Sequence, residues 1–228
     1  MDSEDTRKGI HILNGLWVLI LPFFPRIFAI FIVLLALVFV FILARPNSPY
    51  GSFFRHSFNS MARKEDIEKG YLVGPSIYVL MILILILFVD YRIAGAVFAI
   101  LAFGDGFATI FGRKFGKHKI YNNKTFEGSF AFFLFALLSS ISIFLLINYV
   151  NTDPSDAGLA LISFLMLPDM LNISLSLLIL IFTMVTIMLT FIELFIGDYI
   201  NDNFMIPISG SILLYICFNL LLVFHLNV

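Results

Sequence analysis

The chain has 228 residues, of which 61% are hydrophobic and only 13% are charged, and its mean hydropathy is +1.02. This composition excludes an ordinary soluble domain and predicts an all-α, polytopic integral membrane protein, because several apolar runs are long enough to span a bilayer. The net charge of −1, with the cations near the ends of apolar runs, excludes a nucleic-acid-binding surface.

Seven apolar segments are expected to cross the bilayer as helices of one membrane domain, residues 1–228. They cover residues 10–24, 27–44, 71–89, 93–111, 130–150, 171–195 and 205–226. A spanning helix needs about 20 apolar residues, so the first segment is short and its ends are open. The run 157–167 is shorter still and is expected to be re-entrant or interfacial, which leaves the number of crossings around 1–25 and 157–170 open. Residues 45–70 are expected to form a turn and one short amphipathic helix.

The basic residues indicate the orientation. All 14 Lys and Arg lie at or before Lys124, so residues 1–124 carry a net charge of +6 and the remainder carries −7. The positive-inside rule places the N-terminus and the basic loops 45–69 and 113–124 in the cytoplasm, and leaves only Arg26 and Arg92 outside. Seven crossings then return residues 193–203 to the cytoplasmic face, where every candidate polar motif lies.

The most informative stretch is residues 104–129, at the predicted end of the fourth span. On a helix, four small residues form a bare stripe that a backbone or a ligand can approach closely: Gly104, Ala108, Gly112 and Gly116. A polar stripe lies beside it: Asp105, Thr109, Arg113 and Lys117. An acid able to hold a hard cation, followed by basic residues, suits a metal-bound polyphosphate. We interpret the stretch as a nucleotide site.

Asp105 is predicted to carry Mg²⁺ that bridges phosphates, because an intramembrane acid is costly unless it is paired, solvated or coordinating. Glu127 is the second carboxylate available nearby. Lys124 is predicted to contact phosphate, with Thr125 and the amides around Gly128 as further donors at the start of the next helix. The alternative for Lys124 and the other basic residues is a purely topological role.

Polar residues near both ends of the chain are further candidates. Arg7, Lys8 and His11 can share one helical face, although a histidine there is also typical of a membrane interface. Glu193, Asp198, Asp202 and Asn203 interrupt an apolar region that has no cation after Lys124. Their partners are therefore expected in the basic loops or in a bound metal.

These motifs together resemble the CTP-dependent polyprenol kinase family, which includes phytol, farnesol and dolichol kinases and CTP-dependent diacylglycerol kinases. The central pattern is GD-x-x-A-x-x-x-G-(RK)-x-x-G-K-x-x followed by KT-x-EG-S, carried by residues 104–129. Two further marks are RK-x-x-H with a later glycine, and a late acid followed by DN-x-x-x-P. They lie at Arg7, Lys8, His11 and Gly15, and at Glu193, Asp202, Asn203 and Pro207.

The resemblance implies transfer of the γ-phosphoryl group of CTP to the hydroxyl of a membrane lipid alcohol. It implies Mg²⁺ on Asp105 and Glu127, phosphate contacts from Lys124 with Arg113 or Lys117, and an alcohol oriented or deprotonated by Asp202 or Glu193. Which lipid alcohol is used, and the oligomeric state, stay open.

Two alternatives remain. CTP:phosphatidate cytidylyltransferases are similar in the central stretch, but they usually begin it with Ser-Asp-Thr and carry a late D-R-x-D-S signature. This chain has Gly104-Asp105-Gly106 and no Arg or Lys beyond Lys124, which favours the kinases. A transporter that relays ions through intramembrane acids would place those acids near mid-span and show repeat symmetry.

Overall fold

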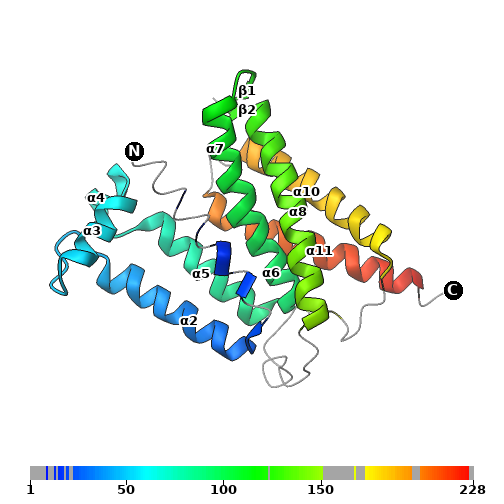
Figure 1. The fold of residues 1–228 in the computed structure, drawn as a ribbon, viewed down its shortest axis with the longest axis horizontal. Helices are drawn as coiled ribbons and strands as arrows, with labels where there is room; N and C mark the ends of the chain where they lie inside the picture. Colours follow the sequence, from blue (N-terminus) through cyan, green and yellow to red (C-terminus); the bar gives the residue numbers. More distant parts are fainter. Residues whose placement is uncertain are drawn as a thin grey trace.

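The computed structural model describes residues 23–122, 124–150, 173–196 and 201–225, together with Gly9, Leu13, residues 15–17, Leu19, Ile20 and Leu167. Helices dominate these residues, joined by one small hairpin (Figure 1). In chain order the elements are α2 (Arg26–Val38), η2 (Phe39–Leu43), α3 (Ser52–Met61), α4 (Lys64–Lys69), α5 (Val73–Phe88), α6 (Tyr91–Ala99), η3 (Ile100–Asp105), α7 (Gly106–Phe115), β1 (Lys119–Tyr121), β2 (Lys124–Thr125), α8 (Phe126–Val150), α10 (Leu175–Ile196) and α11 (Asp202–His225).

The all-α membrane bundle is confirmed in its main features. Five described helices are long and apolar enough to cross a bilayer: Arg26–Leu43, Tyr91–Phe115, Phe126–Val150, Leu175–Phe195 and Asp202–Leu221. Helix α5 is apolar but shorter. The predicted span 10–24 and the run 157–167 lie mainly outside the described residues, so seven crossings stay a prediction. Residues 45–70 contain two short helices, α3 and α4, where the sequence predicted one.

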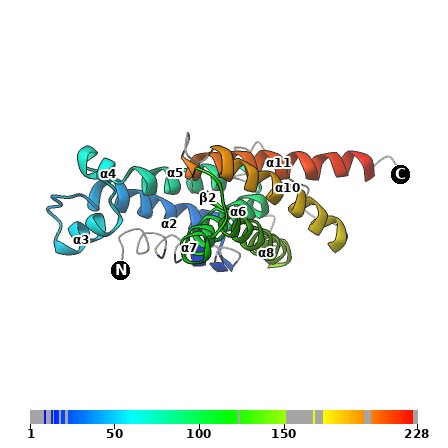
Figure 2. The ribbon, with the colours of Figure 1, turned by 90° about the horizontal axis from the view of Figure 1, so that it is seen from above.

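The centre of the bundle is the continuous helix formed by α6, η3 and α7. Every residue of α6 is buried, because α5, α8 and α11 pack around it. Figures 1 and 2 show α2 and α5 on one side of α7 and α8, with α10 and α11 extending to the other. Close approach depends on glycine: a Cβ on Gly104 would lie 3.1 Å from the Ala136 Cβ of α8. The helix that carries Asp105 is therefore enclosed on several sides.

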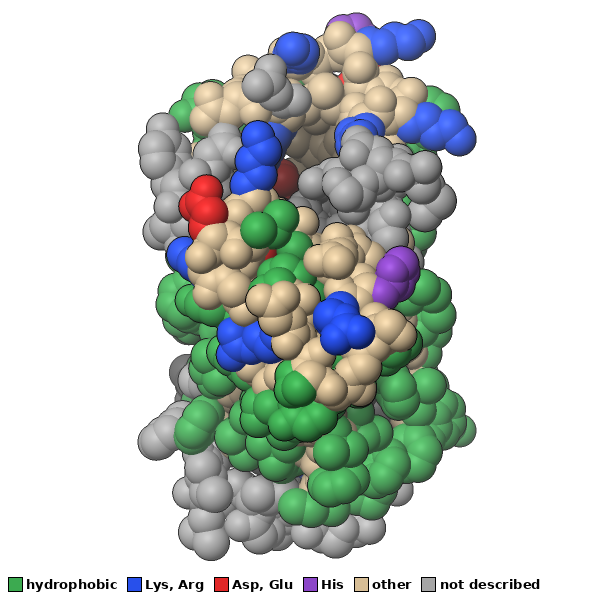
Figure 3. Space-filling view, turned by 90° about the vertical axis from the view of Figure 1, so that its left-hand side faces the viewer, with side chains coloured by type: hydrophobic (Ala, Val, Ile, Leu, Met, Phe, Trp, Pro, Cys, Tyr) green, Lys and Arg blue, Asp and Glu red, His purple; other side chains and the backbone are tan. Residues whose placement is uncertain are grey.

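The outer faces of the bundle are apolar. Large exposed side chains cover the outward faces of α2 and α10: Ile27, Phe31, Leu34, Leu35, Val38, Leu175, Ile179, Leu180, Met184, Ile187, Met188 and Phe191. On the face seen in Figure 3, Lys and Arg side chains are spread from the top to about the middle, and apolar side chains dominate the part below them. This distribution is typical of helices that contact acyl chains and end in a polar, basic region.

Arg26 and Arg92, which the sequence left outside as unexplained cations, are both buried. The Arg26 guanidinium donates to the backbone carbonyl oxygens of Ile86, at 2.7 Å, and Val89. Arg92 forms a bidentate ion pair with Asp90, with Nε to Oδ1 at 2.9 Å and Nη2 to Oδ2 at 2.8 Å. Asp90 also accepts from the backbone N–H of Leu167 at 3.1 Å. These residues hold together the end of the bundle where α5 ends and α6 begins.

Candidate functional site

Asp105 is buried inside the central helix, with only 6% of its surface exposed. The sequence placed it where an apolar span meets water, but the helix continues to Phe115. Asp105 ends the π-helical segment η3, and π-helical segments within α-helices are frequent at functional sites. Its carboxylate interacts electrostatically with Tyr78 of α5, which is itself only 4% exposed. A carboxylate buried among apolar helices is costly unless a cation or a donor stabilises it.

The N-terminus of α11 approaches this region from another side. Asn201 caps the helix, because its Oδ1 accepts from the backbone N–H of Asn203 at 3.0 Å. Asn203 Nδ2 donates to the carbonyl oxygen of Gly74 at 3.2 Å, which ties α11 to α5 one turn before Tyr78. Asp202 is the first residue of α11, where the helix dipole favours an anion.

Packing brings the start of α11 toward the end of η3. Gly210 of α11 lies against Val97 of α6, with a built Cβ 3.3 Å from Val97 Cγ2. Helix α11 also packs against η3. Figures 1 and 2 show α11 crossing the central helix obliquely. Asp105, at the end of η3, and Asp202, at the start of α11, thus lie on two elements that pack against each other.

The structure joins Lys124 and Glu193, which the sequence proposed as separate site residues. Lys124 Nζ lies 2.7 Å from Glu193 Oε1, and it also donates to the backbone carbonyl of Glu193. Both side chains are largely shielded, with 21% and 9% exposed. Since Glu193 lies in the last turn of α10, the ammonium also meets the negative end of the helix dipole. Tyr121 packs against Phe195 with ring centroids 5.4 Å apart, so the β1–β2 hairpin is anchored on α10.

The stripe of small residues is covered by α8. A Cβ on Gly128 would lie 3.1 Å from the Ala108 carbonyl oxygen and 3.2 Å from the Gly112 Cα. Thr125 caps α8, because its Oγ1 accepts from the Gly128 N–H at 3.2 Å. Gly104, Ala108, Gly112 and Gly116 all contact α8 or the residues just before it. Their visible role is close helix packing, and contact with a nucleotide stays a prediction.

Glu127 faces the hairpin. Its Oε1 lies 2.7 Å from His118 Nδ1, and its Oε2 accepts from the His118 backbone N–H at 3.3 Å. Arg113 and Lys117, the predicted phosphate contacts, are exposed around the end of α7. Glu127 contacts His118 of the hairpin, whereas Asp105 lies within the central helix, so their joint binding of a metal stays a prediction.

The described residues contain no group of three or more His, Cys, Asp or Glu side chains that could hold a metal unaided. Mg²⁺ does not require one, because it usually takes one or two carboxylates together with substrate phosphates. The buried Asp105 carboxylate fits that donor set.

The N-terminal motif is visible only in part. Three of its residues lie outside the described residues, namely Arg7, Lys8 and His11. The same is true of Asp198 near the other end of the chain. Gly15, four positions after His11, packs on η3, where a Cβ would lie 2.8 Å from the Ala102 Cβ. Sequence reasoning missed Tyr78 and His118. Tyr78 was detectable as a phenol in the middle of an apolar segment. His118 was detectable as part of the basic loop 113–124.

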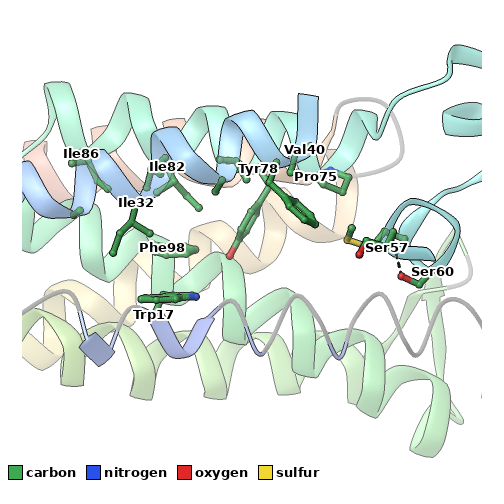
Figure 4. Close-up of a pocket in the computed structure, with 16 residues that line it drawn as sticks. Trp17, Ile32, Val40, Ser57, Ser60, Pro75, Tyr78, Ile82, Ile86 and Phe98 are labelled. Carbon is green, nitrogen blue, oxygen red and sulfur yellow. Dashed lines mark hydrogen bonds between the residues drawn. The ribbon is translucent and has the colours of Figure 1, made fainter. Parts of the chain in front are cut away.

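An elongated apolar cavity of about 390 Å³ lies beside this region. It is lined by residues of α2, α3 and α5, with Trp17 and Phe98 completing the wall. Figure 4 shows Ile32 and Ile86 toward one end, Ser57 and Ser60 toward the other, and the Tyr78 hydroxyl between them. The cavity therefore runs past the hydroxyl group of Tyr78.

The fold and site define a polytopic helical membrane protein with a buried acidic region beside an apolar cavity. In sequence the chain is similar to phytol kinase 1, chloroplastic, of Arabidopsis thaliana, with 37% identity over 151 residues. The alignment covers 60% of this chain and 47% of that relative, so the chain spans about half the length of the curated relative it matches. No family model and no solved structure matches the chain. The similarity confirms the resemblance to polyprenol kinases that the motifs indicated.

Proposed function

We propose that this protein is a CTP-dependent kinase that transfers the γ-phosphoryl group to the hydroxyl of a membrane lipid alcohol of the phytol, geranylgeraniol or polyprenol type. The observation that carries the proposal is the buried Asp105 carboxylate, in a π-helical segment between Tyr78 and the start of α11. The similarity to a phytol kinase supports the same reaction. An acid inside a span is also what a transporter would have, and the kinase relative favours the phosphotransferase.

In this proposal Asp105 holds Mg²⁺ through its carboxylate. When bound, the metal neutralises phosphate charge on CTP and orients the γ-phosphoryl group. Arg113 and Lys117, exposed near the end of α7, contact the phosphates, and Lys124 contributes from the hairpin. Since Lys124 is paired with Glu193 in this structure, Glu193 positions the ammonium group before the nucleotide binds.

Asp202 accepts the proton of the alcohol. The alcohol oxygen forms a bond to the γ-phosphorus, the bond from that phosphorus to the β–γ bridging oxygen breaks, and CDP leaves. We assign the role of base to Asp202 because it begins α11, which packs against η3, the helix segment that carries Asp105. Asn203 fixes Asp202 beside α5 through its hydrogen bond to the Gly74 carbonyl.

The spans explain why a kinase of this kind would be embedded in a membrane. The apolar tail of the alcohol stays in the hydrocarbon region while its hydroxyl reaches the polar end of the bundle. We place that end, with the N-terminus, on the cytoplasmic side, following the distribution of basic residues.

The test is to follow a labelled phosphorus atom. Purified protein in lipid vesicles that contain phosphatidate is given geranylgeraniol, Mg²⁺, and CTP labelled at either the α or the γ position. We expect γ-label in an alkyl phosphate, and loss of the product when EDTA removes the metal. Transfer of α-label to lipid phosphate would instead establish the cytidylyltransferase, and label in neither product would reject both reactions.

A further inference from the structure

The cavity described above has the chemistry of a site for a single apolar chain. Its volume of about 390 Å³ falls in the range of roughly 300–1,000 Å³ that is common for small-molecule sites. Aliphatic and aromatic side chains make up most of its wall, and its polar side-chain groups come from Trp17, Ser57, Ser60 and Tyr78. No Asp, Glu, Lys or Arg is among the described residues that line it, so an ionic head group would be poorly solvated inside.

The cavity connects with the acidic region through α5. Tyr78 lines the cavity and interacts electrostatically with Asp105. Pro75 also lines it, and the preceding residue, Gly74, accepts the hydrogen bond from Asn203 next to Asp202. An occupant therefore has apolar walls along most of its length, and the helix that forms one of those walls, α5, is hydrogen-bonded to the start of α11 beside Asp202.

We propose that this cavity binds the isoprenoid tail of the alcohol substrate and presents the hydroxyl beside Tyr78. The inference rests on the proposed function, which it extends by naming the tail-binding site. One end of the cavity, near Ile32 and Ile86, limits the length of chain that fits, and the end near Ser57 and Ser60 is more polar (Figure 4). The cavity then selects an alcohol with one linear apolar chain over a lipid with two.

Two neighbouring positions on α2 provide a matched pair of variants. Ala36 lines the cavity, whereas the adjacent Leu35 is 53% exposed on the outer face. Ala36→Phe adds a ring inside the cavity and is expected to raise KM for geranylgeraniol about tenfold, because several methylene contacts are lost. The effect on the shorter farnesol should be smaller. Leu35→Phe adds similar bulk toward lipid and should leave both KM values unchanged.

Photolabelling measures occupancy without relying on turnover. Wild-type protein in phosphatidylcholine vesicles is irradiated with geranylgeraniol that carries a diazirine in its tail. We expect adducts on cavity-facing residues of α2 and α5, which excess unlabelled geranylgeraniol should suppress and excess phosphatidylcholine should not. Ala36→Phe should reduce this labelling about tenfold and Leu35→Phe should not.

The outcomes separate the two proposals. Equal competition by phosphatidylcholine, or adducts confined to outward-facing residues, would overturn the tail site even if the protein phosphorylates alcohols. Unchanged KM values and labelling in a folded Ala36→Phe protein would overturn it as well. Specific labelling without any phosphoryl transfer from CTP would retain the tail site and reject the proposed reaction. If Ala36→Phe does not fold, the wild-type adduct map and its competition decide.

Discussion

The two ends of the bundle contain charged residues in very different settings. Where α5 ends and α6 begins, Arg92 and Asp90 neutralise one another, and Arg26 is bound by backbone carbonyl oxygens. In the second region, Asp105 ends η3, which packs against α11, and its charge acts on Tyr78 of α5. Both regions bury charge, and Tyr78, which lies in the second region, lines the apolar cavity.

This difference shows what buried charge alone can indicate. The Asp90–Arg92 pair has short, bidentate geometry and further backbone partners, as expected of a group that stabilises a connection between helices. Asp105 lies in a π-helical segment, and the opposing helix begins with Asp202. The first region should therefore matter for folding and the second for activity, and substitutions can separate the two.

The largest effect is expected for Asp105→Asn. Loss of the carboxylate should lower CTP-dependent lipid phosphorylation about a thousandfold, because a preorganised charge opposite the phosphates is lost. The amide has nearly the same shape, so the protein should remain folded. Initial rates at saturating Mg²⁺ and the thermal unfolding midpoint measure the two properties. Near-normal turnover would show that Asp105 does not hold the metal.

Asp90→Asn should behave in the opposite way. It leaves Arg92 buried with its counter-charge removed, and the protein should lose about 3 kcal/mol of stability. The folded fraction should retain its specific activity. Glu65→Gln is the matched control, since the Glu65–Lys69 pair has the same 2.8 Å separation but exposed side chains, and its effect should be too small to measure. If both changes destabilised the protein equally, burial of the Asp90–Arg92 pair would not be the reason for its larger contribution to stability.

The sequence predicted the elements that depend on local composition. Apolar runs of about 20 residues give spanning helices whatever surrounds them, so α2, α8, α10 and α11 were predicted to within a few residues. The β1–β2 hairpin was missed, because its strands are very short and carry no alternation of apolar and polar residues. The local signal for its turn is Asn122, a residue type that tolerates a positive φ and here has φ 41°.

The candidate site was predictable as a set of residues but not as an arrangement. Lys124 and Glu193 lie 69 positions apart, and nothing local indicates that they pair. The small-residue stripe allowed either a ligand or a helix to approach; in the structure α8 packs against it, and contact with a nucleotide stays a prediction. Arg26 could be assigned only to one side of the membrane, because its partners are backbone carbonyl oxygens that any residue could provide.

Asp202→Asn and Glu127→Gln together test which acid assists Asp105. Asp202→Asn removes the proposed base and should lower kcat about a hundredfold, but it should not change the Mg²⁺ concentration that gives half-maximal activity. Glu127→Gln should change kcat and the Mg²⁺ requirement little, because Glu127 pairs with His118 in the hairpin. Titration of activity with Mg²⁺ distinguishes the two. A strongly raised Mg²⁺ requirement in Glu127→Gln alone would identify Glu127 as a metal ligand, as the sequence predicts.

The smallest expected effect is the coupling between Lys124 and Glu193. A double-mutant cycle with Lys124→Met, Glu193→Gln and the combined variant should give an interaction energy of about 1–2 kcal/mol in stability, because the pair is largely shielded from water. If the pair also prepares Lys124 for the nucleotide, Lys124→Met should raise KM for CTP more than Glu193→Gln does, since only the first removes a cation. A coupling near zero would mean that the hairpin is held by Tyr121 and Phe195 instead. Equal changes in KM for CTP would show that the ion pair acts only through the position of the hairpin, and would leave phosphate binding at this end of the bundle to Arg113 and Lys117.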